Sequence, residues 1–86
     1  ECLAAAGVAA GLPMDLSAKL ALITVAGSGQ LALASEEPPS VLRENVTSPG
    51  GTTLEALKIL MADDGLAPLM TRAIAAATER SRELAR

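Results

Sequence analysis

The segment Thr47–Thr53, with the sequence TSPGGTT, consists of proline, glycines and hydroxyl side chains, and it holds no residue that could fill an apolar core. Pro49 fixes its own φ and disfavours a helical conformation at Ser48. Gly50 and Gly51 allow backbone angles that other residues avoid, and they leave their peptide groups unshielded. The segment therefore predicts an exposed loop whose backbone amides and hydroxyls are free to bind a ligand.

A helix is predicted to begin at the end of this loop, with Thr52 and Thr53 in its opening turn. The first amides of a helix have no partners within it, and they lie at the positive end of the helix dipole. Together with the hydroxyls, such amides favour a small anion such as a carboxylate. Thr52 and Glu55 also have the spacing of a capping box, in which each side chain bonds a free amide at the helix start.

The charge of the segment limits which anion it can bind. No Lys or Arg lies within it, and no Lys follows the glycines as it does in a Walker motif. Both features argue against a tight polyphosphate site, whereas amides and hydroxyls suffice to hold a singly charged carboxylate. On these residues alone, an ordinary turn between two helices explains the segment equally well.

The rest of the chain offers few groups for chemistry. It contains no histidine and a single cysteine, Cys2, so the usual general base, the usual metal sites and an internal disulfide are not expected. The seven basic residues are scattered, aromatic residues are missing and the net charge is -3, which argues against nucleic-acid binding. We expect no metal site and no reaction that this chain runs by itself.

The length and composition favour an oligomer. A chain of 86 residues forms one domain at most, and such a domain buries only about 60–65% of the surface that its unfolded form exposes. Half of the residues are apolar, but none is aromatic and alanine dominates. Because small side chains fill little volume, we expect a second copy of the chain to supply further buried area.

Apolar periodicity predicts an all-α fold of about five helices, which hold the loop in place. The expected helices cover residues 1–11, 13–35, 39–46, 53–64 and 66–85. Gly11 and Pro13 mark the end of the first helix and the start of the second. No capping residue precedes the apolar pattern at Glu1, so we expect the chain to be part of a longer protein. No basic segment typical of a signal peptide is visible.

The second expected helix raises the question of a membrane. Leu16–Ser35 is apolar on nearly all sides, but Lys19 and Gln30 interrupt it. Only about 15 residues run between flanking polar side chains, which is short of the ~20 that span a bilayer. We therefore expect a central, buried helix of a cytoplasmic protein that contacts no membrane.

Within the same helix, Gly27–Ala32 matches the glycine pattern of a dinucleotide-binding turn. Such a turn requires a helix, a second strand and an acidic residue about 20 positions later. The residues that follow, EEPPSVLRENVTSPGG, contain no second strand. We expect a continuous helix here, in which Gly27 and Gly29 admit a neighbouring backbone.

The stretch LRENVTSPGGTTLEALKIL, Leu42–Leu60, resembles the signature segment of the pyrroline-5-carboxylate reductase family. The segments GVAAGLP and GLAPLMTRAIAAATERSREL are similar to the helix break and the C-terminal helix of the family, so the resemblance covers essentially all 86 residues. It implies an all-α C-terminal domain that interlocks with its twin in a dimer, often within larger rings. It also implies the last step of proline biosynthesis, in which NADPH or NADH reduces the C=N bond of 1-pyrroline-5-carboxylate to give L-proline.

The resemblance further implies roles for individual residues. The substrate carboxylate would rest on the loop from Ser48 to Thr53, which includes Gly50 and Gly51. Thr53 would act as the catalytic residue by bonding the region of the ring nitrogen, and Thr52 would contact the carboxylate through its backbone. Asn45 would touch the cofactor.

The family's dinucleotide-binding domain precedes this region and is not part of the sequence. That domain would bind most of the cofactor, so we expect the 86-residue chain to have no reductase activity by itself. Two rival interpretations stay open. One is a non-catalytic helical oligomerisation module in which TSPGGTT is only a turn, and the other is the helical domain of a different two-domain dehydrogenase.

Overall fold

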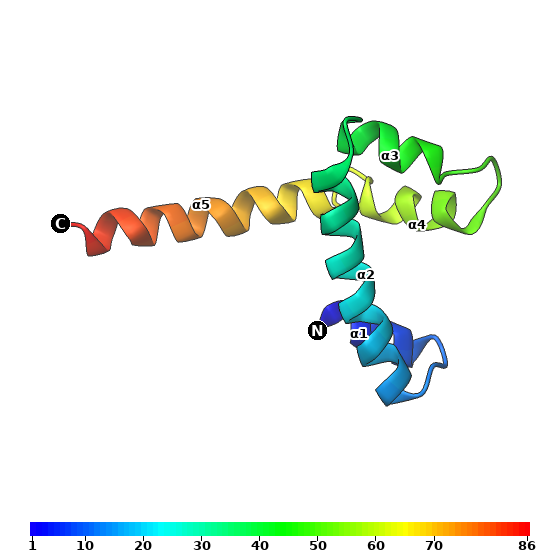
Figure 1. The fold of residues 1–86 in the computed structure, drawn as a ribbon. Coiled ribbons are helices and arrows are strands. Elements are labelled where there is room, and N and C mark those ends of the chain that lie inside the picture. Colours follow the sequence, from blue (N-terminus) through cyan, green and yellow to red (C-terminus); the bar gives the residue numbers. More distant parts are fainter. The chain divides into compact units, whose positions relative to one another are not determined.

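The computed structural model describes all 86 residues as five helices without a strand, which confirms the all-α prediction (Figure 1). The helices are α1 (Cys2–Ala9), α2 (Met14–Ala34), α3 (Pro39–Asn45), α4 (Thr52–Leu60) and α5 (Leu66–Leu84). Their contacts divide the chain into unit 1, Glu1–Leu42, and unit 2, Arg43–Arg86. Each unit is described by itself.

The predicted end of α4 is wrong. The helix ends at Leu60, and the next five residues form a turn rather than a further helical turn. The chain folds back so tightly that a Cβ atom on Gly65 would overlap the carbonyl oxygen of Leu60. Glycine at this position permits the close approach, and Gly65 then becomes the N-cap of α5.

In unit 1, α1 and α2 form a helical hairpin. Gly11 adopts a φ of 109°, which only glycine adopts easily, and the amide of Leu12 donates to the carbonyl of Gly7 at 3.0 Å. Pro13 has the fixed φ that suits the position before a helix, and its carbonyl accepts the amide of Ser17 at 2.9 Å. The break between the two helices therefore follows from the glycine and the proline predicted to cause it.

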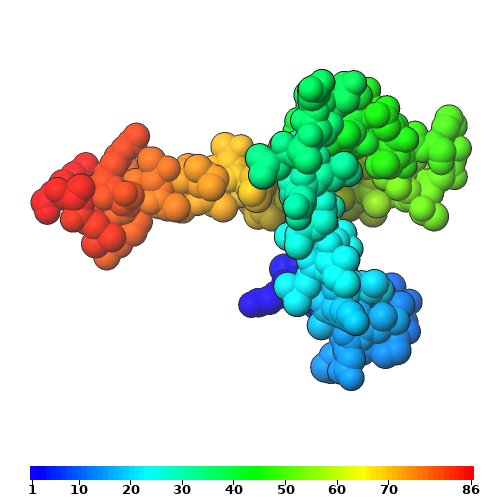
Figure 2. All heavy atoms as spheres, in the orientation of Figure 1, coloured from blue at the N-terminus to red at the C-terminus, as the bar shows by residue number.

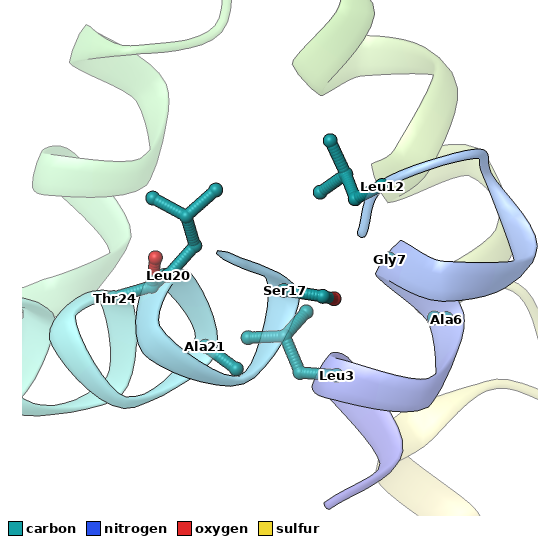
Figure 3. Close-up of a pocket in the computed structure, with 8 residues that line it drawn as sticks. All are labelled: Leu3, Ala6, Gly7, Leu12, Ser17, Leu20, Ala21 and Thr24. Carbon is teal, nitrogen blue, oxygen red and sulfur yellow. The ribbon is translucent and has the colours of Figure 1, made fainter. Parts of the chain in front are cut away.

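The contact between α1 and α2 depends on small residues. Ser17 is only 2% exposed, and its hydroxyl donates to the carbonyl of Ala4 in α1 at 2.6 Å. Gly7 lies opposite, and a Cβ atom added to it would overlap the Oγ of Ser17. Figure 3 shows the serine side chain pointing at α1 between Leu3 and Gly7. A glycine on one helix and a satisfied hydroxyl on the other allow the two backbones to approach closely.

The expectation that α2 is buried on all sides is wrong for the single chain. Ser17 is its only buried residue, and most of its large apolar side chains are exposed: Met14, Leu16, Leu20, Leu22, Ile23, Val25, Leu31 and Leu33. The cause is that α1 covers one face and is only eight residues long. By length and composition alone, the 21-residue α2 could cross a membrane.

Unit 2 also lacks a closed core. Its helices contact one another only sparsely, and no residue in it is buried. The apolar side chains of α5 face solvent, with Leu69, Ile74 and Leu84 more than half exposed. Figure 2 shows the C-terminal half of α5, in orange and red, with no other part of unit 2 against it. No hydrophobic residue of the whole chain is buried, so a stable core requires atoms from outside this chain.

Candidate functional site

The predicted loop is a tight turn with a defined geometry. The amide of Gly51 donates to the carbonyl of Ser48 at 3.0 Å, and Gly50 has a φ of 71°. A proline at the second position and a positive-φ glycine at the third are the signature of a type II turn, so Ser48–Gly51 adopts this geometry. The structure thus explains the order of Pro49 and Gly50 in the sequence.

The helix α4 begins directly after the turn, with Gly51 as its N-cap. The amides of Thr52, Thr53 and Leu54 have no acceptor within the chain, and the first amide to find one is that of Glu55, which donates to the carbonyl of Gly51 at 3.4 Å. Three unpartnered amides therefore lie at the positive end of α4, which is the feature on which the predicted anion site depends.

The predicted capping box is wrong. No side chain caps α4, and the carboxylate of Glu55 instead pairs with Lys58 at 2.8 Å. The physical reason is register: Thr52 is the first residue inside the helix, while a capping box requires it to be the flanking residue. Because the threonine is not used as a cap, the first amides of α4 stay available to a ligand.

The two threonines of the turn differ in their surroundings. Thr53 is half-buried, whereas the side chain of Thr52 is exposed, and neither hydroxyl is bonded to a protein atom. Ser48 is exposed, and its Oγ lies where a Cβ atom on Gly51 would stand. The loop therefore offers amides and hydroxyls on one short stretch of chain, and Gly51 leaves the room that these groups need.

Asn45, the predicted cofactor residue, is the last residue of α3 and is exposed. Its side-chain amide carries one acceptor and two donor positions and makes no bond to the protein, so it fits a single hydrogen-bonded contact with a cofactor. Gly27–Ala32 does not form a phosphate-binding turn, because these residues lie within α2, as predicted from the sequence. The cofactor role of Asn45 stays a prediction.

A groove of about 340 Å³ lies beside the loop in unit 2. It is lined by Arg43, Glu44, Thr47, Leu54, Leu57, Lys58 and Met61. Of the segment TSPGGTT it takes in only Thr47, and of the three α4 residues with free amides only Leu54 lines it. A ligand on those amides would need a further wall from outside the chain.

The sequence analysis assigned no role to Thr47. Its side chain is half-buried, and its hydroxyl donates to the carbonyl of Arg43 at 2.6 Å. A threonine four residues after a helical carbonyl is spaced to make this bond, which is the signal that could have identified it. Arg43 also pairs with Glu44 at 3.9 Å, so a carboxylate already lies beside the cation nearest to the loop.

The groove between α1 and α2, of about 330 Å³, has no comparable chemistry. Figure 3 shows its lining, which is apolar apart from Ser17 and Thr24, and the Ser17 hydroxyl is already bonded to Ala4. No group of three His, Cys, Asp or Glu residues is arranged to hold a metal ion. The loop before α4 is therefore the candidate site of this chain.

Known proteins similar to this chain share one name. The pea protein called pyrroline-5-carboxylate reductase is 46% identical over 84 residues, which are 98% of this chain and 30% of the pea protein. The protein of that name from Synechocystis is 44% identical, over 98% of this chain and 31% of its own length. The chain spans about 30% of the length of these curated relatives.

A solved structure agrees with these relatives. The crystal structure of Plasmodium falciparum pyrroline carboxylate reductase with NADP bound matches 99% of this chain and 32% of its own chain, with a TM-score of 0.90 and 34% sequence identity. The model of the family described as pyrroline-5-carboxylate reductase dimerisation matches residues 1–84. Because this match extends over nearly the whole sequence, the chain belongs to the pyrroline-5-carboxylate reductase dimerisation family.

Proposed function

We propose that the chain is the C-terminal dimerisation and substrate-binding domain of a cytoplasmic enzyme that reduces 1-pyrroline-5-carboxylate to L-proline with NADPH or NADH. One observation carries the proposal: in a chain of this family, a type II turn presents three unpartnered amides at the start of α4. A preceding domain would bind most of the dinucleotide, so the chain alone has no reductase activity.

The turn and the start of α4 bind the substrate carboxylate. The amides of Thr52, Thr53 and Leu54 are unpartnered, and a carboxylate has two oxygens that accept several such bonds. The positive helix end matches a single negative charge without a cation in the loop. Ser48 adds a hydroxyl, while Gly50 and Gly51 keep the backbone accessible to the ligand.

Thr53 acts on the other end of the substrate. The nicotinamide cofactor, when bound, supplies the hydride that adds to the imine carbon. As hydride adds to the imine carbon, the π electrons of the C=N bond move onto the ring nitrogen, which gains a proton from solvent. The half-buried hydroxyl of Thr53 donates a hydrogen bond to that nitrogen. A donor held in place where charge develops stabilises the transition state more than the ground state. Asn45 contacts the cofactor and orients it toward the imine.

A second copy of the chain covers the exposed apolar faces. No hydrophobic residue is buried in the single chain, and the apolar residues of α2 and α5 lie open to solvent. A homodimer would bury these faces and make α2 the inner helix of a soluble assembly rather than a membrane span. It would also supply a wall for the substrate loop, which a single chain leaves open.

The test is the activity of the complete protein. We expect purified enzyme to consume NADPH or NADH only when 1-pyrroline-5-carboxylate is present and to form L-proline, whereas the 86-residue chain alone does neither. A complete protein that assembles but has no such activity would support the oligomerisation module instead. Activity on another substrate, with no competition by proline analogues, would identify a different dehydrogenase.

A further inference from the structure

We propose that Thr47 is a positioning residue of this enzyme: its hydroxyl fixes the point at which the substrate loop leaves α3. The inference rests on the proposed function, because it assigns a kinetic role within the same reaction. Thr47 touches neither reactant in this proposal and acts through the loop that follows it.

The geometry that carries the inference lies at the end of α3. The carbonyl of Arg43 accepts two bonds, one from the Thr47 hydroxyl at 2.6 Å and one from the amide of Val46 at 3.3 Å. The amide of Thr47 also donates to the carbonyl of Glu44 at 3.1 Å. Thr47 thus bonds the last turn of α3 through both its side chain and its backbone, and the hydroxyl bond is the shortest of the three.

This bond matters because α3 is short. A helix of seven residues is weakly stable by itself, and its last carbonyls have no partners within the helix. The side chain of Thr47 is also half-buried, and it lines the groove beside α4 together with Leu54 and Leu57. Thr47 is therefore bonded to the end of α3 and lies in a groove that α4 also lines.

The position of Thr47 affects the proposed site residues on either side of it. Asn45 lies two residues before Thr47, and Ser48 follows it directly. A shift of Thr47 would move the first residue of the type II turn, and with it the direction of the free amides of α4. Most of the cofactor is bound outside this chain in the proposed enzyme, so the shift weakens binding of the imine substrate more than binding of the cofactor.

The experiment compares Thr47→Val with Thr47→Ser in the complete enzyme. Valine keeps the size and branching of threonine but removes the donor, whereas serine keeps the donor. We expect Thr47→Val to raise the KM for 1-pyrroline-5-carboxylate by about 3- to 10-fold, the size of one lost hydrogen bond. The KM for NADPH and the value of kcat should stay within about twofold of the original, and Thr47→Ser should restore the substrate KM.

Thr78→Val is the matched control. The Thr78 hydroxyl makes the same kind of bond, to the carbonyl of Ile74 at 2.8 Å, but it lies in the middle of α5 and outside the proposed site. We expect this variant to leave every kinetic constant unchanged. Equal changes of the kinetic constants in Thr47→Val and Thr78→Val would indicate a general effect of removing a threonine hydroxyl, and they would overturn the proposal.

The remaining outcomes are also decisive. An unchanged substrate KM in folded Thr47→Val, or a rise that Thr47→Ser fails to reverse, would overturn the positioning role while leaving the proposed function intact. If Thr47→Val and Thr47→Ala both fail to form the native oligomer while Thr47→Ser forms it, Thr47 is a purely structural residue and the proposal is wrong. Wild-type enzyme that does not reduce 1-pyrroline-5-carboxylate would overturn the proposed function and this inference together.

Discussion

Serine and glycine occur together in two regions of this chain, the contact between α1 and α2 and the turn before α4, and they do opposite things there. In the first region, the Ser17 hydroxyl is 2% exposed and bonded to the carbonyl of Ala4, and Gly7 provides the space for it. In the second, the Ser48 hydroxyl and the amides of Thr52 and Thr53 have no protein partner. The first region uses its polar groups for packing, and the second leaves them unpartnered within the chain.

The difference shows what separates a structural contact from the proposed binding site. Residue type is nearly the same in both regions, so composition alone does not distinguish them. What differs is whether the local backbone supplies an acceptor for each donor. Around Ser17 the neighbouring helix supplies one, whereas the type II turn and the helix start expose donors that their own geometry cannot satisfy.

The largest expected effect comes from Thr53→Ala in the complete enzyme. If the Thr53 hydroxyl donates to the ring nitrogen during hydride transfer, its loss should lower kcat/KM by about 100-fold, as for the removal of one preorganised donor. The oligomer should keep its mass in size-exclusion chromatography, because the hydroxyl bonds no protein atom.

Thr52→Ala is the matched control for this prediction. The Thr52 side chain is exposed, and its proposed contribution is the backbone amide, which alanine retains. We expect a change in kcat/KM of less than about threefold. Equal effects of the two substitutions, or loss of assembly in Thr53→Ala with normal turnover of the remaining oligomer, would favour the purely structural turn.

The second prediction is a double-mutant cycle of Gly7→Ala and Ser17→Ala. Gly7→Ala alone should lower the free energy of unfolding by about 1–3 kcal/mol, because its Cβ would overlap the Oγ of Ser17. In the Ser17→Ala background the overlapping oxygen is gone, so the same change should cost at least about 1 kcal/mol less. Chemical denaturation at one fixed protein concentration measures all four variants. Additive effects would contradict the close contact described here.

The positions of the helices could be predicted because the chain marks their ends with residues of restricted geometry. Gly11 and Pro13 separate α1 from α2, and Pro49 with Gly50 forms the turn before α4. The end of α4 could not be predicted in the same way. It depends on the close approach of Gly65 to the carbonyl of Leu60, which is a contact in space rather than a pattern along the chain.

Two further features, the start of α4 and the exposure of α2, could not be predicted from the sequence. The capping-box prediction was wrong because α4 begins one residue earlier than expected, so that Thr52 lies inside the helix rather than at the flanking position. Sequence patterns locate helix ends only to within one or two residues. The prediction that α2 is buried was wrong for the single chain, because only α1 covers this helix. Its apolar pattern reflects the surroundings that the helix would have in an assembled protein. The free amides, in contrast, were expected, since every helix start has them.

The third prediction concerns the turn itself. Gly50 has a φ of 71° and no neighbouring atom within 4 Å of an added Cβ, so Gly50→Ala tests backbone conformation without a steric clash. A left-handed conformation costs a non-glycine residue about 1–2 kcal/mol, so we expect the substrate KM to rise by about 5- to 30-fold. Asparagine tolerates positive φ better, so Gly50→Asn should have a smaller effect. Equal effects of the two variants would show that the conformation of Gly50 is not what the site requires.

The smallest expected effect is that of Lys58→Ala, which tests whether Glu55 serves the site through its ion pair. The two charged groups are 2.8 Å apart, but their side chains are 60% and 66% exposed, so water screens the attraction. We expect a loss of at most about 0.5 kcal/mol in the free energy of unfolding and no change in the substrate KM. The loss should vanish in about 1 M salt, where the Debye length falls to roughly 3 Å. A change in KM that appears at low salt and disappears in about 1 M salt would mean that Glu55 needs its ion pair with Lys58 to orient the start of α4. The free amides would then depend on a side chain as well as on the backbone.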